Sequence, residues 1–505
     1  AQAGAEAKAV VKVLHGISTG WLCPGQRDAD DVTPPRVPRA RHAPTQYTMV
    51  RVDQRKQQQQ PDAAAAHNQR FHTSTKPTPK QMQLNKQISA AANSGDASAL
   101  SNLIRGNVDH FNSVNCATAL HQLAKRASNA RDGGGSSGIA DEAATSLHAL
   151  LAARTAAVMS REQADVTPRS LTSIVWAMGK LRLFDTRLRD EMASHAASQL
   201  TRGLLDPFGI ANVAWALATL HQHAASATSE TVNTSEVHGS LLASLAQRAC
   251  EVPHDFKPQE LCNLLWAFAT LKVRHAKLFE GFAEAATRQM HSFTPQGLSQ
   301  TMWAYSKLNL SKHALLLSAA QSAIPKLPTY DVQSLATLAW AFANLEVEHR
   351  PLLSAICTEA SKRPSQFGTA SCSQLLWALS RLNDGVSPSA ISALASRLTE
   401  IAHEGLNPQN LLYALGALAK LPKSLEPSLP SLLCSAAART AKSLTANKLG
   451  IAAWALSRPL VHDRLNGEVK EAWKVALRQR SSQVVAHLGW RSIGYVETAL
   501  RKLSG

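Results

Sequence analysis

Cysteine is scarce in this chain, and its few copies are scattered. The 505 residues include seven cysteines, at positions 23, 116, 250, 262, 357, 372 and 434, and none belongs to a Cys-x-x-Cys pair. An odd and dispersed set excludes a disulfide framework and lacks the spacing of a zinc site. We therefore interpret the cysteines as small buried side chains in a reducing compartment.

Long apolar runs and catalytic motifs are also missing. No run approaches the roughly 18 apolar residues that a membrane-spanning helix needs. The chain has no Gly-Lys-Ser/Thr phosphate loop, no His-Glu-x-x-His and no cluster of acids for a metal. Residues 134–138 match Gly-x-Ser-x-Gly, but they lie in a Gly/Ser spacer with no strand before it. The sequence therefore predicts a protein without a membrane span, catalytic residues, metal or cofactor.

Acidic residues are too few to balance the basic ones. Lys and Arg total 53 against 36 Asp and Glu, which gives a net charge of +17. Residues 1–80 hold 12 basic and 6 acidic side chains, so the rest of the chain is basic as well. This surplus favours a polyanionic partner, nucleic acid first. Charge alone does not choose between RNA, DNA and an anionic membrane surface.

What the chain does have is a Trp-Ala pair that recurs at nearly regular intervals. Trp stands before Ala at positions 176, 215, 266, 303, 340, 377 and 454, and Tyr413-Ala414 is assigned to the one gap. Most steps between copies are 36 to 41 residues, and one is 51. His121 and Thr498 take the Trp position in weaker copies at the two ends. A period of this length is typical of stacked repeats.

Within one copy, the apolar pattern is that of two helices. Leu261, Leu264 and Phe268 follow Pro258 at helical spacing, and a second apolar period covers about residues 275–291. One such pair cannot bury both of its apolar faces, so neighbouring pairs must supply the core. The expected fold is all-α, a right-handed α-solenoid of about ten helix-turn-helix repeats of roughly 37–38 residues.

We assign residues 81–505 to this helical array, with inserts near 127–140 and 222–237 that we expect to be loops between repeats. Residues 1–80 are basic, rich in Pro and Gln and poor in periodic aliphatic residues, which indicates disorder. Their composition also suits an organelle-targeting leader, although such leaders are poor in acidic residues and this segment contains Asp28, Asp30 and Asp31. A plain disordered tail is the alternative.

The recurring Trp, numbered position 0, has two readings. A helical wheel places it opposite the aliphatic residues at −5, −2 and +5, which face the partner helix. We expect the Trp to fill the seam between consecutive repeats. The alternative is an exposed platform on which a base stacks.

Two positions beside the Trp form a polar stripe, because −3 and +4 are seven residues apart. Position −3 carries amides and hydroxyls, at Ser173, Asn212, Asn263, Gln300, Thr337, Gln374 and Asn410. Position +4 is basic at Lys125, Lys180, Lys307, Arg381, Arg458 and Lys502. Amides and hydroxyls can bond base edges, while Lys and Arg neutralise phosphates. The stripe predicts RNA binding; the alternative is that −3 bonds the next repeat and +4 complements the helix dipole.

The motif Leu-Cys-Asn-Leu-Leu-Trp-Ala-Phe-Ala-Thr-Leu at 261–271, with its copies, resembles the octotricopeptide repeat family. These are organellar proteins built from helical-hairpin repeats. Residues 111–121 resemble the opening repeat of such proteins, and the array is also similar to the helical region of FAST-kinase-like mitochondrial RNA regulators. The resemblance covers roughly residues 84–503. It implies RNA binding in a mitochondrion or plastid, in RNA processing, mRNA stability or translation.

The leading hypothesis is a non-catalytic protein that binds single-stranded RNA along the solenoid, in the mitochondrion or alternatively in a plastid. The rival is a protein–protein scaffold or a structural component of an organellar ribosome, working with other RNA-processing proteins, since a solenoid is a general binding surface. A continuous basic groove would favour RNA. Cations paired with acids or buried in seams would favour a protein partner.

Overall fold

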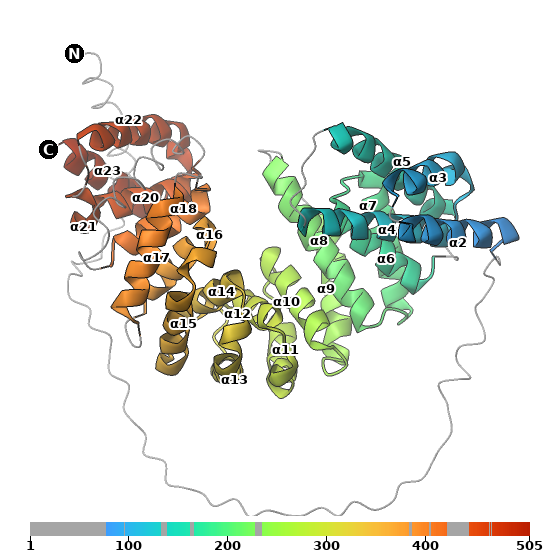
Figure 1. The fold of residues 1–505 in the computed structure, drawn as a ribbon, viewed down its shortest axis with the longest axis horizontal. Coiled ribbons are helices and arrows are strands. Elements are labelled where there is room, and N and C mark those ends of the chain that lie inside the picture. The colour runs from blue at the N-terminus through green and yellow to red at the C-terminus, as the bar shows by residue number, and fades with distance from the viewer. Residues whose placement is uncertain are drawn as a thin grey trace, which may run out of the picture.

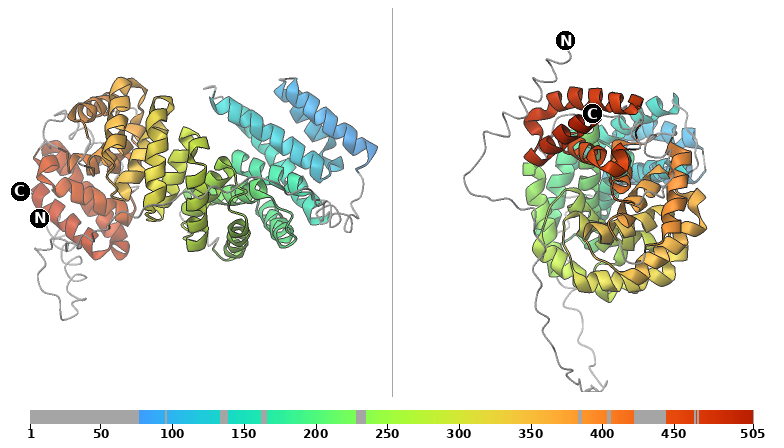
Figure 2. Two further views of the ribbon diagram at one scale, coloured as in Figure 1. Left: turned by 90° about the horizontal axis from the view of Figure 1, so that it is seen from below. Right: turned by 90° about the vertical axis from the view of Figure 1, so that its left-hand side faces the viewer.

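The computed structural model describes residues 77–504 apart from 95, 133–138, 162–165, 228–234, 383–385, 403–405, 422–443, 464 and 466, and these residues form an all-helical solenoid. Successive helices pack side by side along an arc (Figure 1). Seen from one end, the array curves round into a ring (Figure 2). The predicted all-α solenoid is confirmed. Residues 1–76, most of the segment assigned to a leader, lie outside the described residues.

The helices form two layers, which we call inner and outer. In Figure 1, α10, α12 and α14 lie on the inner side of the arc, and α11, α13 and α15 lie on its outer side. The inner helices are α2 (Pro79–Asn93), α4 (Ser113–Asp132), α6 (Pro168–Leu181), α8 (Pro207–Ala227), α10 (Pro258–Thr270), α12 (Pro295–Lys307), α14 (Val332–Asn344), α16 (Thr369–Leu379), α18 (Pro408–Leu418), α20 (Ala446–Ser457) and α23 (Trp490–Ser504). Each packs on the next one in the series, and from α4 to α18 these are the most extensive contacts between elements in the described chain.

The outer helices pair with the inner ones and also follow one another. They are α3 (Ala97–Asn107), α5 (Ile139–Arg161), α7 (Thr186–Thr201), α9 (Ser235–Glu251), α11 (Ala276–Arg288), α13 (His313–Ala323), α15 (Arg350–Lys362), α17 (Pro388–Ile401) and α22 (Gly467–Val484). Shorter helices complete the described part: α21 (Pro459–His462), η2 (Val108–His110), η3 (Met290–Ser292), η4 (Ile324–Thr329), η5 (Pro364–Gln366) and η8 (Val485–His487). Outer neighbours touch less closely than inner neighbours, as a curved stack requires.

The inner helices begin where local chemistry favours a helix start. Proline occupies the first turn of α6, α8, α10 and α12, where its missing N–H costs no hydrogen bond. The side chains of Thr167, Thr294 and Asp331 cap their helices by accepting backbone N–H groups. In α10 the carboxylate of Glu260 accepts the N–H of Lys257 at 2.9 Å. These starts fix where the Trp position falls on each inner helix.

Four inner helices end in a left-handed residue six positions after the Trp. Arg182, Lys272, Asn309 and Glu346 all have a φ between 52° and 59°. The following residue donates its N–H back to the carbonyl at position +2, as Val273 does to Phe268 at 2.8 Å. A non-glycine residue pays about 1–2 kcal/mol for this conformation. The tight turn nevertheless recurs, because it aims the chain directly at the outer helix.

Aliphatic and aromatic side chains fill the space between the layers. Leu261, Leu264 and Phe268 of α10 are fully buried, as are Leu278 and Phe282 of α11. Burying one such side chain contributes roughly 1.5–3 kcal/mol. This packing confirms the two apolar periods that the sequence shows.

Polar side chains on or just after the outer helices also bond the chain that leads into the inner helix of the same pair. Gln199 donates to the carbonyl of Val166 at 2.8 Å, and Gln289 donates to that of Phe256 at 3.0 Å. Arg154, Arg397 and Arg480 reach the equivalent carbonyls of Phe111, Phe367 and Leu444 at 2.8–3.1 Å. Each acceptor lies ten residues before the Trp position, so the tie recurs with the repeat.

Two expectations about the organisation need correction. The inserts are not loops between repeats: α4 runs to Asp132 and α8 to Ala227, so each insert lies between the two helices of one pair and is partly helical. The array also has an additional pair at its start, since α2 packs on α4 in the place of a preceding inner helix, although less extensively than most later inner helices pack on each other. That pair has no Trp-Ala. In the other inner helices the Trp position lies eight residues after the first helical residue, and in α2 this place is taken by Gln87.

The seam between α6 and α8 yields a test of the packing. A Cβ at Gly179 would lie 2.5 Å from Cζ3 of Trp215, whereas a Cβ at Gly106 of α3 would meet nothing within 4 Å. Overpacking costs about 1–3 kcal/mol, while Gly to Ala in an open helix gains roughly 0.5–1 kcal/mol. We expect Gly179→Ala to lower the thermal midpoint measured by circular dichroism and Gly106→Ala to hold or raise it. Equal midpoints would contradict this account of the seam.

Candidate nucleic-acid interface

The first residue of an inner helix lies eight positions before the Trp, and this spacing sets the register of the polar stripe. It holds for Pro168 and Trp176, and for Pro258 and Trp266. The same spacing runs through α8, α12, α14, α16 and α20, and it also supports Thr498 as the Trp position of α23. Equivalent side chains therefore occupy equivalent places on successive inner helices.

One assignment changes under this rule. Helix α18 starts at Pro408, after the capping residue Asn407, so its Trp position is Gly416 rather than Tyr413. The steps on either side then become 39 and 38 residues. Asn410 falls in the first turn of α18 and is 9% exposed, so it is not equivalent to the other residues at −3.

The corrected register adds residues that sequence reasoning missed. In this register Tyr413 takes position −3 and Lys420 takes position +4. Tyr413-Ala414 imitates Trp-Ala and drew the alignment three residues too early. The signal that finds the right register is the Pro408 helix start, read at the spacing of the other copies.

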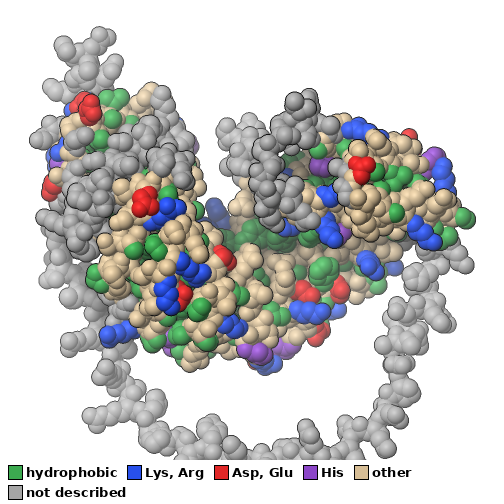
Figure 3. Space-filling view, viewed as in Figure 1, with side chains coloured by type: hydrophobic (Ala, Val, Ile, Leu, Met, Phe, Trp, Pro, Cys, Tyr) green, Lys and Arg blue, Asp and Glu red, His purple; other side chains and the backbone are tan. Residues whose placement is uncertain are grey.

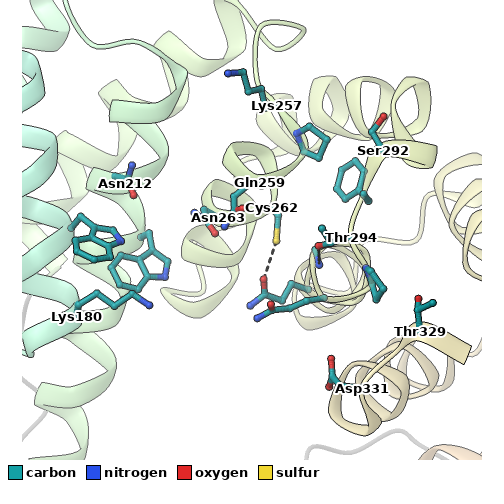
Figure 4. A pocket seen from close by; sticks show the side chains of 18 residues that line it. Lys180, Asn212, Lys257, Gln259, Cys262, Asn263, Ser292, Thr294, Thr329 and Asp331 are labelled. Atoms are coloured by element: carbon teal, nitrogen blue, oxygen red, sulfur yellow. Dashed lines mark hydrogen bonds between the residues drawn. The ribbon is translucent and has the colours of Figure 1, made fainter. Parts of the chain in front are cut away.

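A hollow of about 750 Å³ lies across the inner helices from α6 to α14. The stripe residues Lys180, Asn212, Asn263 and Gln300 line it. Gln259 and Gln296, at position −7 of their repeats, Lys257 and the rings of Trp176 and Trp215 also face it. In Figure 4, Lys180, Asn212 and Asn263 lie on successive inner helices around this space. The structure thus brings four of the predicted residues together.

Two of the stripe amides around this hollow keep hydrogen-bonding capacity. Asn212 is only 4% exposed and donates to the carbonyl of Phe208 at 2.9 Å, so its amide is engaged within α8. Gln300 accepts from the thiol of Cys262 at 3.1 Å, which leaves its NH₂ free to donate (Figure 4). Asn263 makes no side-chain hydrogen bond within the described chain. Because Asn and Gln amides both donate and accept, such groups can bond the edge of a base.

Other predicted residues at −3 are held by neighbours. Gln333 donates to the side-chain oxygen of Gln374 at 2.9 Å and to Thr337 at 3.4 Å, which ties α14 to α16. Ser173 is half-buried on α6 and does not line the hollow. The polar stripe therefore has an open part, at α10 and α12, and a part engaged between repeats.

The Trp rings fill the seams, as the wheel predicts, but most keep a partly exposed edge. Trp340 and Trp377 stack with centroids 6.0 Å apart, and Trp377 contacts Tyr413 at 5.5 Å. Trp340 is 6% exposed, whereas Trp176, Trp215 and Trp377 are only half-buried. A ring so placed serves the packing first and is open to a ligand on its remaining edge.

Cations at +4 lie over the same rings. The ammonium of Lys180 is 5.9 Å from the Trp176 centroid and 5.4 Å from that of Trp215. Lys307, Arg381 and Arg458 lie 5.1–6.0 Å from the Trp rings of their own repeats. Such contacts are worth about 0.5–1 kcal/mol each at exposed sites. They hold the positive charges in place without neutralising them.

Several +4 side chains also bond the preceding inner helix. Asn344 donates to the carbonyl of Ser306 at 3.0 Å, Arg381 to that of Ala343 at 3.4 Å and Lys502 to that of Ser457 at 2.6 Å. Each acceptor is at position +3, among the last carbonyls of a helix, where positive charge is favoured. Arg381 and Lys502 thus have a structural role as well as a charge.

The basic stripe is interrupted by acid at one place. Arg381 forms an ion pair with Glu346 at 2.7 Å. These two residues, with Glu348, Leu382 and Lys420, line a smaller hollow of about 380 Å³. Burial first, and then the positive charges of Arg381 and Arg458, lower the pKa of Lys420, while Glu346 acts in the opposite direction. Lys420 therefore stands beside other cations.

Lys125, at the other end of the stripe, is exposed on α4. It lies near His121, whose pKa is lowered by burial and then by the charge of Lys125. The ring of His121 contacts Trp176 at 4.8 Å, so the weak first copy packs like the later ones.

Outside the stripe, the described residues offer little chemistry. They contain no group of three or more His, Cys, Asp or Glu side chains arranged for a metal ion. Burial raises the pKa of the Cys262 and Cys372 thiols to about 12, which suppresses the reactive thiolate. The Gly-x-Ser-x-Gly match at residues 134–138 lies outside the described residues. None of the described helices has the length and apolar character that a bilayer crossing needs.

The face of the molecule in Figure 3 carries basic and acidic side chains in mixture over the outer helices. Hydrophobic surface and some basic side chains appear on the inner side of the arc in the same view.

Comparison with known proteins gives one family. Residues 142–388 match the family model described as RNA-editing substrate-binding complex 6 protein, a span from α5 to the first residue of α17 that includes the whole of the larger hollow. A search of curated proteins finds no match. Among solved structures, a chain from a homology model of the full-length AP-3 complex in an intermediate open conformation is similar at 13% identity, over 84% of this chain and 79% of that one, with a TM-score of 0.28. So low a score carries no argument about function.

The family match supports similarity to an RNA-associated group of helical proteins. It neither includes nor excludes the octotricopeptide repeat or FAST-kinase-like proteins, so that resemblance stays a prediction.

The position of Lys180 between two Trp rings can be tested directly. Lys180→Met keeps the aliphatic stem and removes the charge, so we expect it to destabilise the protein by about 1 kcal/mol. Lys277→Met on the outer helix α11 is the control, because Lys277 is exposed and contacts no Trp ring. Urea unfolding followed by Trp fluorescence measures both variants. Equal midpoints for the two would show that the ring contacts contribute nothing.

Proposed function

We propose that this protein is a non-catalytic organellar RNA-binding solenoid that holds single-stranded RNA along its inner helices. The observation that carries the proposal is the larger hollow, where amides with spare donors and acceptors meet Lys180 and two half-buried Trp rings. Aromatic faces, amides and cations in one groove are the groups that single-stranded nucleic acids need. The family matched by residues 142–388 is named for RNA editing, which supports an RNA ligand.

The site residues then divide by task. Asn263 and Gln300 would bond base edges, while Lys125, Lys180, Lys307, Lys420 and Arg458 would meet phosphates. These five cations form no ion pair within the described chain, in contrast to Arg381 with Glu346. RNA processing, stability or translation is the kind of process that a binder without catalytic groups would serve.

A protein scaffold, or a structural part of an organellar ribosome, is the alternative. The Arg381–Glu346 pair and the mixed charges of the outer helices favour it, because alternating charge suits a protein surface. We place RNA first because the open amides lie inside a hollow rather than on a flat surface.

Salt dependence tests the electrostatic part of the proposal. Five phosphate contacts on a single strand give a log–log slope of affinity against salt of about −3.5. Changing Lys180, Lys307, Lys420 and Arg458 together to Gln should bring the slope to about −0.7. Fluorescence anisotropy with a labelled single-stranded RNA measures it, and circular dichroism confirms the fold.

The matched control changes four basic residues of the outer helices to Gln: Arg187, Lys277, Arg288 and Lys362. Its slope and affinity should equal those of the unchanged protein. A similar loss in both quadruple variants would reject the inner groove as the binding surface, and a slope near zero in the unchanged protein would reject RNA binding by these cations.

We also propose a mitochondrial location, with a plastid as the alternative. Residues 1–80, fused to a fluorescent reporter, should direct it to mitochondria because leaders of this kind act through positive charge. The control is the same segment with its 12 basic residues changed to Gln, which should stay in the cytosol. A diffuse cytosolic signal from the unchanged segment would contradict the prediction.

A further inference from the structure

Neighbouring inner helices bring position +6 of one repeat close to position +4 of the next. Position +4 belongs to the polar stripe, whereas position +6 does not. Glu346 is at +6 on the left-handed turn after α14, and its carboxylate meets the guanidinium of Arg381, at +4 on α16, at 2.7 Å. The left-handed backbone is what turns the +6 side chain toward the following helix. This ion pair shows that the two positions are within reach of each other.

The same two positions between α10 and α12 both carry lysine. Lys272 is at +6 with a φ of 59°, against 56° for Glu346, and its turn has the same backbone hydrogen bonds. Lys307 is at +4, with its ammonium 6.0 Å from the Trp303 ring. The pKa of Lys307 is lowered, first by burial and then by the charge of Lys272, which agrees with their proximity. Neither lysine has an ion pair or a side-chain hydrogen bond within the described chain.

Two adjacent positive charges raise the energy of the folded protein unless an anion joins them. The ends of α10 and α12 offset this only in part, since a helix C-terminus carries about half of a negative charge. The equivalent positions in the next two repeats avoid this repulsion. Between α14 and α16, Glu346 at +6 neutralises Arg381 at +4. Between α12 and α14, both positions are uncharged, since Asn309 is at +6 and Asn344 is at +4. At Lys272 and Lys307 the neutralising group is missing from the described residues.

We propose that Lys272 and Lys307 form a clamp for a backbone phosphate of single-stranded RNA, and that the charge at position +6 decides which repeats grip the strand. The inference deepens the proposed function and rests on it. A lysine at +6 opens the adjacent +4 cation to phosphate, whereas a glutamate closes it.

The clamp lies at a suitable place relative to the larger hollow. Gln300 of α12 faces the hollow, and Lys307 follows it seven residues later on the same helix. Seven residues are two helical turns, or about 10 Å. A strand that crosses α10 and α12 therefore has amides for a base at one level and two ammonium groups for a phosphate at another.

Reciprocal charge changes test the clamp. Lys272→Glu copies the Glu346–Arg381 pair onto α10 and α12, so it should weaken binding of a 12-nucleotide oligouridine and flatten the salt slope by about 0.7, the value for one phosphate contact on a single strand. Glu346→Lys copies the lysine pair onto α14 and α16, and should strengthen binding and steepen the slope by a similar amount. The double exchange should return the slope to its original value.

The control is Lys277→Glu, which makes the same change of charge on the outer helix α11. The thermal midpoint of Lys272→Glu should be unchanged or raised, because an ion pair replaces a repulsion. If Lys277→Glu weakens binding as much as Lys272→Glu, or if Glu346→Lys has no effect, the clamp is wrong while RNA binding stands. If the unchanged protein binds no RNA, the proposed function itself fails.

Discussion

The close side-by-side packing of the inner helices is the constraint on which the rest of the structure depends. Small residues allow it: a Cβ at Gly179 would strike the ring of Trp215, and Gly416 lies against Trp377. A single helix pair leaves apolar faces exposed, so each repeat is stable only against its neighbours. Because every inner helix is held in the same register, equivalent side chains line up along the array.

Because of this packing, some residues of the polar stripe hold neighbouring repeats together and others remain available to a ligand. Arg381 and Lys502 bond the ends of the preceding helices, and Gln333 ties Gln374 to its neighbour, so these residues belong to the architecture. Lys180 and Lys307 rest on Trp rings and form no ion pair with any described residue, and Asn263 and Gln300 face an open hollow. The basic residues therefore form neither a continuous free groove nor a set that is wholly paired with acids or buried in seams. Lys180 lines the same hollow as the open amides, and this meeting of cation, amide and Trp ring favours a nucleic acid.

Much of the fold could be predicted from local pattern. Pro258 and the apolar residues after it specify α10, and the second apolar period specifies α11, because helix starts and 3.6-residue spacing are properties of a short segment. The register of α18 could not be obtained from Tyr413-Ala414, since a motif of two residues cannot distinguish a Trp position from a look-alike three residues away. The pair α2–α3 was missed as a repeat for a related reason: it packs like the others but lacks Trp-Ala.

The amino-acid sequence by itself determined the repeating helix pairs, the basic balance and the side of the inner helix on which the stripe lies, since all three follow from composition and helical period. Only the tertiary structure decided which stripe residues are available. Glu346 and Arg381 are 35 residues apart in sequence, and so are Lys272 and Lys307, yet the first two form an ion pair whereas the two lysines have no acidic partner in the described part of the chain. Which side chains meet across a seam depends on the left-handed turns and on the packing of separate helices, and no local pattern encodes that geometry.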